Sequence, residues 1–366
     1  MRISENPSRA GFLSDDGLHR PRSSALADIL RDPDYFPDRI DPASGLMRFV
    51  ATSRGVLDHS SFLDGRSALG VTAFVAPIEE VAALAPAAAD PVRWIFHTAF
   101  CGSTLLSRMC GVPGKVLCLR EPQALVDLDS WRTGLGDGDR ALYAALASAV
   151  VGQMAKARAP GEALLIKPSN WVNGALDDFL APARGDRAMV LSSDPAAFLV
   201  AVLRGGRPRI EYTLRLADHL LQSRPALRDA AVRLLPQTGE PMVRALRLAL
   251  LAHWAQLCLF AARFRAPGED LHAARLDYDR LAAEGEDALA FASARLSLGL
   301  APDEIAASVA RHRSRHAKND DGEAEWRGDE AANRAVMDAW GPAVGEALRI
   351  VPTLRSANAS MIAALA

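Results

Sequence analysis

A short turn between two apolar runs carries the residues best suited to chemistry in this sequence. The segment 94–108 reads Trp-Ile-Phe-His-Thr-Ala-Phe-Cys-Gly-Ser-Thr-Leu-Leu-Ser-Arg. Its first half predicts a buried strand and its Leu-rich end predicts a helix. A turn at that place puts backbone N–H groups and two hydroxyls at the positive end of the helix dipole. The segment therefore predicts a phosphate or sulfate site made of Cys101, Gly102, Ser103, Thr104 and Leu105.

This turn lacks the lysine of nucleotide-hydrolysing loops. Those loops read Gly-x-x-x-x-Gly-Lys-Ser/Thr, and the lysine reaches the terminal phosphates. Here Ser103 follows Gly102, so hydrolysis of ATP or GTP is not expected. The competing interpretation of the same residues is an ordinary helix start capped by Ser or Thr.

The run Cys101-Gly102-Ser103-Thr104-Leu105-Leu106 resembles the 5′-phosphosulfate loop of sulfotransferases. That loop ends in Ser-Gly-Thr-Thr or Ser-Gly-Ser-Thr before a Leu-rich helix. The resemblance implies a P-loop-like α/β domain and 3′-phosphoadenosine 5′-phosphosulfate (PAPS) as co-substrate, with no metal. It extends more weakly over about residues 92–320, through the segments 274–281 and 298–300 and a basic loop at 311–318.

Three further residues are candidates for catalysis. Glu121 follows the apolar run 116–119 at the place where some sulfotransferases carry a catalytic Glu, and a carboxylate there could accept the proton of an acceptor hydroxyl. Lys167 ends the run 164–166, in a Lys-Pro-Ser sequence similar to the Lys-x-Pro of bacterial family members, and would bring a positive charge near the sulfuryl group. His97 lies at the end of the first strand. For each, a purely structural role is the alternative: a capping or Arg-paired acid, a solvated strand-end lysine, a core histidine.

The sequence departs from the family pattern at two places. Phe100 stands where most members have Lys or Arg, a charge that stabilises the bridging oxygen as the sulfuryl group leaves. The Arg and Ser that bind the donor's 3′-phosphate are also missing, since Ser193 occupies the Arg position and Ala201 the Ser position. Phosphate recognition favours Arg. Ser192 and Ser193 could still donate hydrogen bonds. The charge could come from Arg204, from Arg207 or from the loop 311–318, which contains Arg315 and Lys318.

The elements that would position these residues alternate between strands and helices. Short apolar runs predict strands at 92–98, 116–119, 163–166, 188–191 and 272–276, and Ala- and Leu-rich stretches predict helices at 140–158, 214–235, 241–265 and 285–297. This order predicts a three-layer α/β fold, a parallel sheet with helices on both faces. Segment 311–327 is polar and is expected to form a surface loop.

The N-terminal quarter predicts a smaller layer. A loosely ordered arm at 1–24 precedes a short helix at 25–31 and strand-like pieces at 47–51 and 71–75. A linker at 84–90 then leads into the main domain. We therefore expect an N-terminal arm and accessory region at 1–88 and a sulfotransferase-like P-loop domain at 89–366.

Composition narrows the class of protein. The 366 residues are 49% hydrophobic and carry 42 basic against 44 acidic side chains, a net charge of −2, so no general attraction to nucleic acid is expected. No membrane span and no N-terminal leader are expected, which predicts a cytoplasmic protein. The four cysteines show neither a Cys-x-x-Cys pair nor a zinc-ligand spacing, and buried thiols are expected.

Three functions fit these features. The first is a sulfotransferase that moves a sulfuryl group from PAPS to the hydroxyl or amine of a small-molecule acceptor. The second is a non-catalytic nucleotide or anion binder of the same fold, which Phe100 favours. The third, a phosphoryl transferase, is weakened by the missing Gly-Lys-Ser/Thr and by the lack of an acidic pair for a metal.

Overall fold

The computed structural model describes most of the chain in two compact units. The described residues are 20–66, 69–235, 239–264, 273–313 and 330–365. The first unit holds those of 1–94, 110–187 and 296–300, and the second those of 95–109, 188–295 and 301–366. The strand at 92–97 is shared, because its first three residues cluster with the first unit and its last three with the second.

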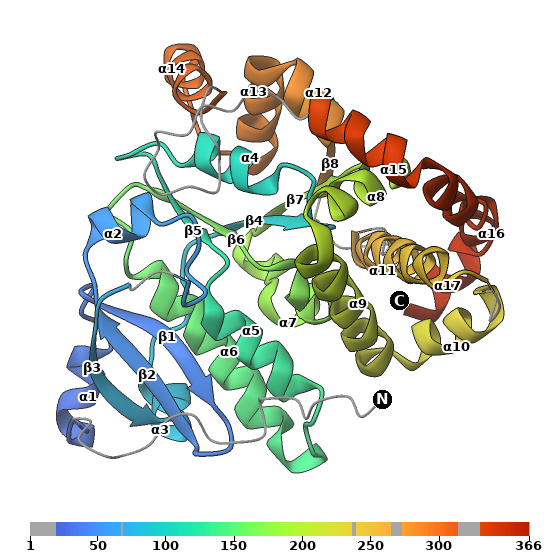
Figure 1. Ribbon diagram of the computed structural model, residues 1–366. Coiled ribbons are helices and arrows are strands. Elements are labelled where there is room, and N and C mark those ends of the chain that lie inside the picture. The colour runs from blue at the N-terminus through green and yellow to red at the C-terminus, as the bar shows by residue number, and fades with distance from the viewer. Residues whose placement is uncertain (1–19, 67–68, 236–238, 265–272, 314–329, 366) are drawn as a thin grey trace. The chain divides into compact units, whose positions relative to one another are not determined.

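An antiparallel sheet of three strands opens the first unit, in the order β1-β2-β3: Tyr35–Asp41, Leu46–Ala51 and Val71–Pro77. Helices α1 (Ser23–Ile29), α2 (Arg54–His59) and α3 (Ile78–Leu84) accompany it. The predicted helix and the two strand-like pieces are confirmed, whereas β1 was missed. Figure 1 shows α5 (Gln123–Arg132) and α6 (Arg140–Ala155) beside this sheet, where both contact β1.

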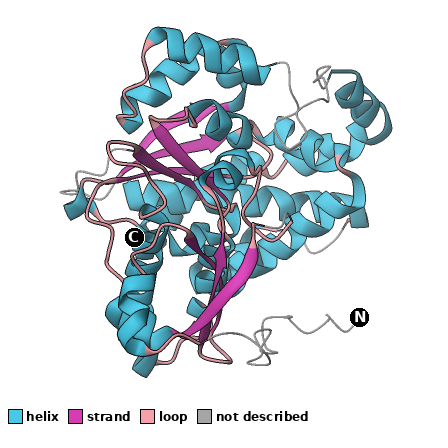
Figure 2. Ribbon diagram, turned by 90° about the vertical axis from the view of Figure 1, so that its left-hand side faces the viewer, coloured by secondary structure: helices cyan, strands magenta, loops and turns pink. Residues whose placement is uncertain are grey.

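The strands of a second sheet are parallel, as predicted. Its order is β5-β6-β4-β7-β8, and Figure 2 shows its strands as a group separate from β1–β3. Their bounds are β4 Val92–His97, β5 Val116–Arg120, β6 Ala163–Lys167, β7 Arg187–Ser192 and β8 Ala273–Asp277. All five residues of β5 are buried, because helices flank the sheet and leave neither face to water. The α/β class is therefore confirmed.

The remaining elements of the first unit are short and lie between strands of the parallel sheet. Three 3-10 turns and one helical turn follow α5 or β6: η2 (Asp137–Asp139), η3 (Asn170–Ala175), α7 (Leu176–Phe179) and η4 (Pro182–Arg184). In register, Arg120 at the end of β5 pairs with Lys167 at the end of β6. The two strands thus end together, which brings the residues that follow them into one place.

Helices dominate the second unit. They are α4 (Ser103–Cys110), α8 (Pro195–Arg204), α9 (Gly206–Ser223), α10 (Pro225–Leu234), α11 (Pro241–Phe264), α12 (Tyr278–Ala283), α13 (Gly285–Leu296), α14 (Pro302–Arg313), α15 (Glu330–Leu348), α16 (Val351–Ser356) and α17 (Asn358–Leu365). Helix α11 is central and contacts α8, α9, α15, α16 and α17.

One helix prediction and one loop prediction were wrong in detail. The single helix expected at 214–235 is divided between α9 and α10, because Pro225 cannot continue a helix and forces Arg224 into an extended conformation with φ −137° and ψ 97°. Of the surface loop expected at 311–327, residues 311–313 continue α14, and the residues from 314 on lie outside the described ones.

Helix α11 has the length and composition of a membrane span. Among the described residues it is the one helix that meets this test, and 78% of its most apolar window is buried inside the protein. A helix that is apolar on all sides and covered by neighbouring helices is expected in the centre of a large folded unit. Packing inside the second unit therefore accounts for its composition.

Candidate functional site

The loop that follows β4 has an unusual backbone. Ala99 and Phe100 have φ angles of 74° and 51°, and Gly102 has 76°. Residues other than glycine rarely adopt positive φ, since the Cβ atom then crowds the backbone. Such strain persists where the surrounding structure enforces it, and it is concentrated at binding sites and catalytic sites. Turns of this kind also point successive N–H groups into one concavity.

Hydrogen-bond donors of this loop are open. Among the described residues, none accepts from the backbone N–H groups of Gly102, Ser103 or Thr104, or bonds to the two hydroxyls. Both hydroxyl residues are nevertheless buried. The hydroxyl of Thr98, at the start of the loop, is buried and also has no partner in the described part of the chain. Together these groups form a set of donors at the N-terminus of α4, which is the arrangement that binds anions.

Backbone contacts with β7 fix the loop in place. The N–H of Thr98 donates to the carbonyl of Leu191 at 3.1 Å, and the Cys101 thiol donates to the same carbonyl at 3.5 Å. His97 is buried, and its Nδ1 accepts from the N–H of Ala99 at 3.2 Å. The structure therefore gives His97 a role in shaping the strained turn, and its catalytic role stays a prediction.

Gly102 lies directly under an aromatic ring. A Cβ atom at this position would lie 2.8 Å from Cδ2 of Tyr278 and 3.2 Å from Cδ2 of Leu281. Both residues belong to α12, which follows β8. Only glycine combines the positive φ with this close approach. The packing of α12 onto the loop thus explains why the sequence has glycine here.

Phe100 holds a cation beside the loop. The guanidinium carbon of Arg209 lies 5.1 Å from the centroid of the Phe100 ring, within the range of a cation–π interaction. Phe198 and Tyr212 surround the same ring, each at 6.2 Å between centroids. Gly205 leaves the space for Arg209, since a Cβ there would lie 1.9 Å from its Cδ. The positive charge of Arg209 therefore lies beside Phe100, the position where most members of the resembling family have Lys or Arg.

The ends of β5 and β6, in the first unit, carry a cluster of paired charges. Lys167 is buried and its Nζ pairs with Oε1 of Glu121. The other carboxylate oxygen accepts from Arg66 at 3.2 Å, and the Arg66 guanidinium lies 3.5 Å from the centroid of Phe62. Glu121 itself has a φ of 54°, and its N–H donates to the carbonyl of Lys167 at 2.7 Å. We call Arg66, Glu121 and Lys167 the strand-end cluster.

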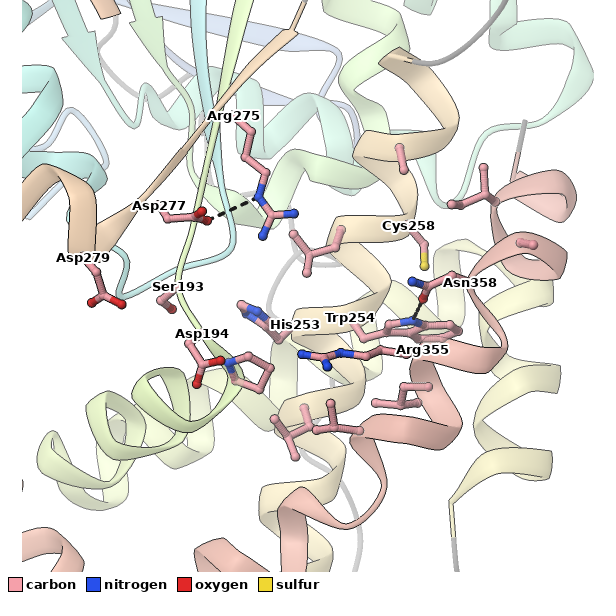
Figure 3. A pocket seen from close by; sticks show the side chains of 18 residues that line it. Ser193, Asp194, His253, Trp254, Cys258, Arg275, Asp277, Asp279, Arg355 and Asn358 are labelled. Carbon is pink, nitrogen blue, oxygen red and sulfur yellow. Dashed lines mark hydrogen bonds and ion pairs between the residues drawn. The ribbon is translucent and has the colours of Figure 1, made fainter. Parts of the chain in front are cut away.

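A cavity of about 590 Å³ lies in the second unit, at the ends of β7 and β8 (Figure 3). Its polar side includes Ser193, Asp194, Arg275, Asp277 and Asp279, and its other side is formed by α11, α16 and α17. Ligands of open α/β sheets bind at the carboxyl ends of the strands. The size is that of a pocket for a small organic molecule.

Two buried groups line this cavity. The hydroxyl of Ser193 is buried and has no hydrogen-bond partner among the described residues. His253 is also buried, and neither ring nitrogen makes a hydrogen bond of standard geometry to the described part of the chain. Burial, with a smaller contribution from Arg275, lowers the pKa of His253 to about 4, against the opposing effects of the Ser193 backbone and Asp194. The imidazole is therefore neutral near pH 7.

Two of the residues predicted to bind the 3′-phosphate already have side-chain partners. Ser192 donates to Oδ1 of Asp277 at 3.0 Å, and Arg204 donates to Asn333 at 3.0 Å. Three carboxylates share a cavity with Ser193, and this disfavours a phosphate beside it. Leu105 follows Thr104 as the third residue of α4 and is half-buried. Arg315 and Lys318 lie outside the described residues.

Several site residues were missed at the sequence level: Arg66, Arg209, His253, Arg275, Asp279 and Arg355. Arg66, Arg209, His253 and Arg355 belong to no local motif. Arg275 and Asp279 lie in the segment 274–281, whose resemblance to the family gave them no role. Among the described residues, no group of three or more His, Cys, Asp or Glu side chains could hold a metal ion. All four cysteines are buried thiols, as predicted.

Compared with known proteins, the chain matches no family model and no curated protein. The fold and the geometry of the sites therefore carry the functional argument.

Proposed function

We propose that this protein is a P-loop-like, sulfotransferase-type enzyme that transfers a sulfuryl group from PAPS to the hydroxyl or amine of a small acceptor. The observation that carries the proposal is the loop 99–104. Its backbone is strained, and the N–H groups and hydroxyls of Ser103 and Thr104 have no partner among the described residues. In the proposal Gly102, Ser103 and Thr104 hold the 5′-phosphosulfate. A resemblance in sequence and a geometry suited to an anion then point to the same residues.

The reaction needs positioning and charge more than covalent help from the protein. The acceptor oxygen or nitrogen attacks sulfur, the bond from sulfur to the bridging phosphate oxygen breaks, and that oxygen leaves with the electron pair. The acceptor proton passes to a base. Donors aimed at the departing oxygen stabilise the transition state. Arg209, stacked on Phe100, is the cation that we assign to this task in place of the lysine or arginine that the loop lacks.

The roles predicted for Glu121 and Lys167, as base and as electrostatic helper, remain part of the proposal. Their ion pair supports a fixed orientation of the Glu121 carboxylate, since Lys167 and Arg66 each hold one of its oxygens. A carboxylate can accept a proton only if an oxygen lone pair is within reach of the acceptor.

Calorimetry on the full chain tests the loop assignment. We expect adenosine 3′,5′-bisphosphate, the spent donor, to bind without metal, and ATP with Mg²⁺ to bind far more weakly. Ser103→Ala with Thr104→Ala should weaken the bisphosphate by at least tenfold, because two charge-assisted hydrogen bonds are lost. Ser223→Ala, which removes a hydroxyl at the end of α9, is the matched control. Equal binding by both variants would contradict the assignment, and tight binding of MgATP would favour a phosphoryl transferase.

Transfer of labelled sulfate from PAPS to a metabolite extract then tests catalysis. A labelled product that disappears in the Ser103→Ala, Thr104→Ala variant is the expected result. Binding without any transfer would leave the second candidate, a non-catalytic nucleotide or anion binder. The observation that favours that candidate is Phe100, which stands where a catalytic loop would have Lys or Arg.

A further inference from the structure

The cavity at the ends of β7 and β8 contains unpaired charges of both signs. Asp279 and Arg355 line it, and neither side chain forms an ion pair or hydrogen bond with a described residue. Asp194 accepts from the N–H of Ala196 through Oδ1 at 2.8 Å, and its carboxylate has no cationic partner among the described residues. Opposite charges that share a cavity without pairing remain available to a ligand.

The other polar groups of the cavity are less available to a ligand. Asp277 accepts from Ser192 at 3.0 Å and from Arg275 at 3.3 Å, so both of these charged side chains already have a partner. His253 is uncharged near pH 7, since burial holds its pKa at about 4. The buried hydroxyl of Ser193 can donate one hydrogen bond and can also accept.

One side of the same cavity is apolar. Leu250, Leu257 and Ile362 line it together with the Trp254 ring. The indole N–H of Trp254 donates to the Asn358 side chain at 2.6 Å, and this hydrogen bond fixes the orientation of the ring (Figure 3). A fixed aromatic surface beside aliphatic side chains favours a ligand with an apolar body, since burial yields about 25 cal/mol per Å² of apolar area.

The acidic and basic side chains of the cavity come from different elements. Figure 3 shows Asp194 and Asp279 on the side of β7 and β8, while Arg355 extends from α16. A ligand in the cavity would therefore meet negative charge from the strand ends and positive charge from the helix. Three carboxylates against two guanidinium groups disfavour a phosphate or another dianion here.

We propose that this cavity binds a small zwitterion with a large apolar side chain, such as an apolar α-amino acid. Its ammonium group lies with Asp194 and Asp279, its carboxylate with Arg355, and its side chain against Trp254. This binding requires no sulfuryl donor, and it is independent of the transfer reaction proposed for the loop.

Calorimetry with three related compounds tests the proposal on the full chain. L-phenylalanine has both charges, 2-phenylethylamine lacks the carboxylate, and 3-phenylpropionate lacks the ammonium. We expect saturable binding of phenylalanine and at least tenfold weaker binding of each analogue, because one charge-assisted contact is lost in each case. Phenylethylamine that binds as tightly as phenylalanine would overturn the proposal, as would the absence of heat with all three compounds.

Variants connect each charge of the ligand to its residue. Arg355→Gln should remove the preference for phenylalanine over phenylethylamine, and Asp279→Asn with Asp194→Asn should remove the preference over phenylpropionate. Arg334→Gln and Asp229→Asn change the same charges on exposed positions outside the cavity and should leave both preferences intact. Competition between phenylalanine and adenosine 3′,5′-bisphosphate would assign the cavity to a nucleotide instead, and would overturn the proposal without affecting the loop assignment.

Discussion

The strand-end cluster of the first unit and the loop of the second unit both lie at the carboxyl ends of parallel strands. They differ in whether their polar groups have partners. In the cluster, Lys167 pairs with Glu121, and Arg66 pairs with both Glu121 and Asp64. In the loop, the N–H groups and hydroxyls of Ser103 and Thr104 have no partner among the described residues. We call the strand-end cluster closed because its charges are paired, and we call the loop open because its donors lack a partner among the described residues.

Backbone strain does not distinguish the two regions. Glu121 has a φ of 54° and Phe100 one of 51°, so each region contains a non-glycine residue in the left-handed conformation. What differs is the satisfaction of hydrogen-bond donors. The buried hydroxyl of Thr98 has no partner among the described residues, and a buried polar group without a partner costs roughly 1–3 kcal/mol. A fold retains such a cost where a ligand supplies the missing acceptors. Open donors, more than strain, therefore support the anion site that we propose at the loop.

Gly102→Ala should have the largest effect and abolish the binding of adenosine 3′,5′-bisphosphate. The new Cβ would lie 2.8 Å from the Tyr278 ring at a φ of 76°, so the loop or α12 must move and the donors lose their common direction. Calorimetry measures the affinity, which we expect to fall at least a hundredfold.

Gly114→Ala is the matched control for this prediction. Gly114 has a φ of 78°, and a Cβ there would meet no atom within 4 Å. The two substitutions therefore introduce the same backbone strain, about 1–2 kcal/mol, and only one of them disturbs the loop. If both variants bind the bisphosphate alike, the loop is not the anion site and the contrast between the two regions fails.

Arg209→Met should have the next largest effect, on the rate of sulfuryl transfer. Removal of one positioned donor from a site that stabilises developing negative charge costs roughly 10²–10³-fold in rate. Arg209→Lys should retain part of the activity, since it keeps the charge and loses the planar stacking on Phe100. Single-turnover assays with labelled PAPS measure these rates.

Arg215→Met serves as the control on the same helix, because this arginine is exposed. A rate that falls equally in both arginine variants would show that α9 contributes only general charge. If Arg209→Met keeps the wild-type rate, Arg209 is not the cation that stabilises the departing oxygen.

The sequence predicted those strands that are apolar without interruption. Val116–Arg120 and Ala163–Lys167 are almost wholly buried, and a short continuous apolar run between two helices is typical of a strand covered on both faces. Strand β1 was missed because Pro37, Asp38 and Arg39 interrupt its pattern. Asp38 is buried only because Arg48 of the neighbouring strand pairs with it, and the pattern of a single strand does not contain that information.

The loop was predictable because its chemistry is local. Three consecutive residues, Gly102 to Thr104, contain both the glycine and the hydroxyls. Arg209 reaches Phe100 from more than a hundred residues away, and Arg66 reaches Glu121 across 55 positions. No local sequence pattern around a single arginine predicts which distant residue it will contact. Contacts of this kind are decided by the packing of helices and require coordinates.

Lys167→Met should lower the free energy of unfolding by about 3 kcal/mol, since it leaves Glu121 without its buried partner. The loss is at the low end for such pairs because Arg66 still compensates the carboxylate. Glu121→Gln combined with Lys167→Met should restore most of the stability, because no uncompensated charge remains. Urea denaturation measures all three proteins.

The exposed pair Arg207–Glu211 provides the comparison for this closed cluster. Glu211→Gln should leave stability unchanged within error, because water and salt screen an exposed pair. A cluster that tolerates Lys167→Met equally well would not be electrostatically closed, and the contrast with the loop would lose its basis.

The smallest effect concerns His253, the buried neutral histidine that lines the cavity of the second unit. Its pKa is about 4 in the folded protein and near 6.5 in an unfolded chain, so protonation favours unfolding. The stabilisation from the neutral form is present above about pH 6.5 and is lost as the pH falls toward 4. We expect a loss of about 2 kcal/mol between about pH 7 and pH 5.

The His253→Gln variant should lack this part of the slope. Because all other titrating groups are common to both proteins, the difference between their urea denaturation curves at the two pH values isolates the histidine. Equal slopes would mean that the ring gains a proton inside the fold, where it would add a positive charge beside Asp194 and change the balance of charges in the cavity.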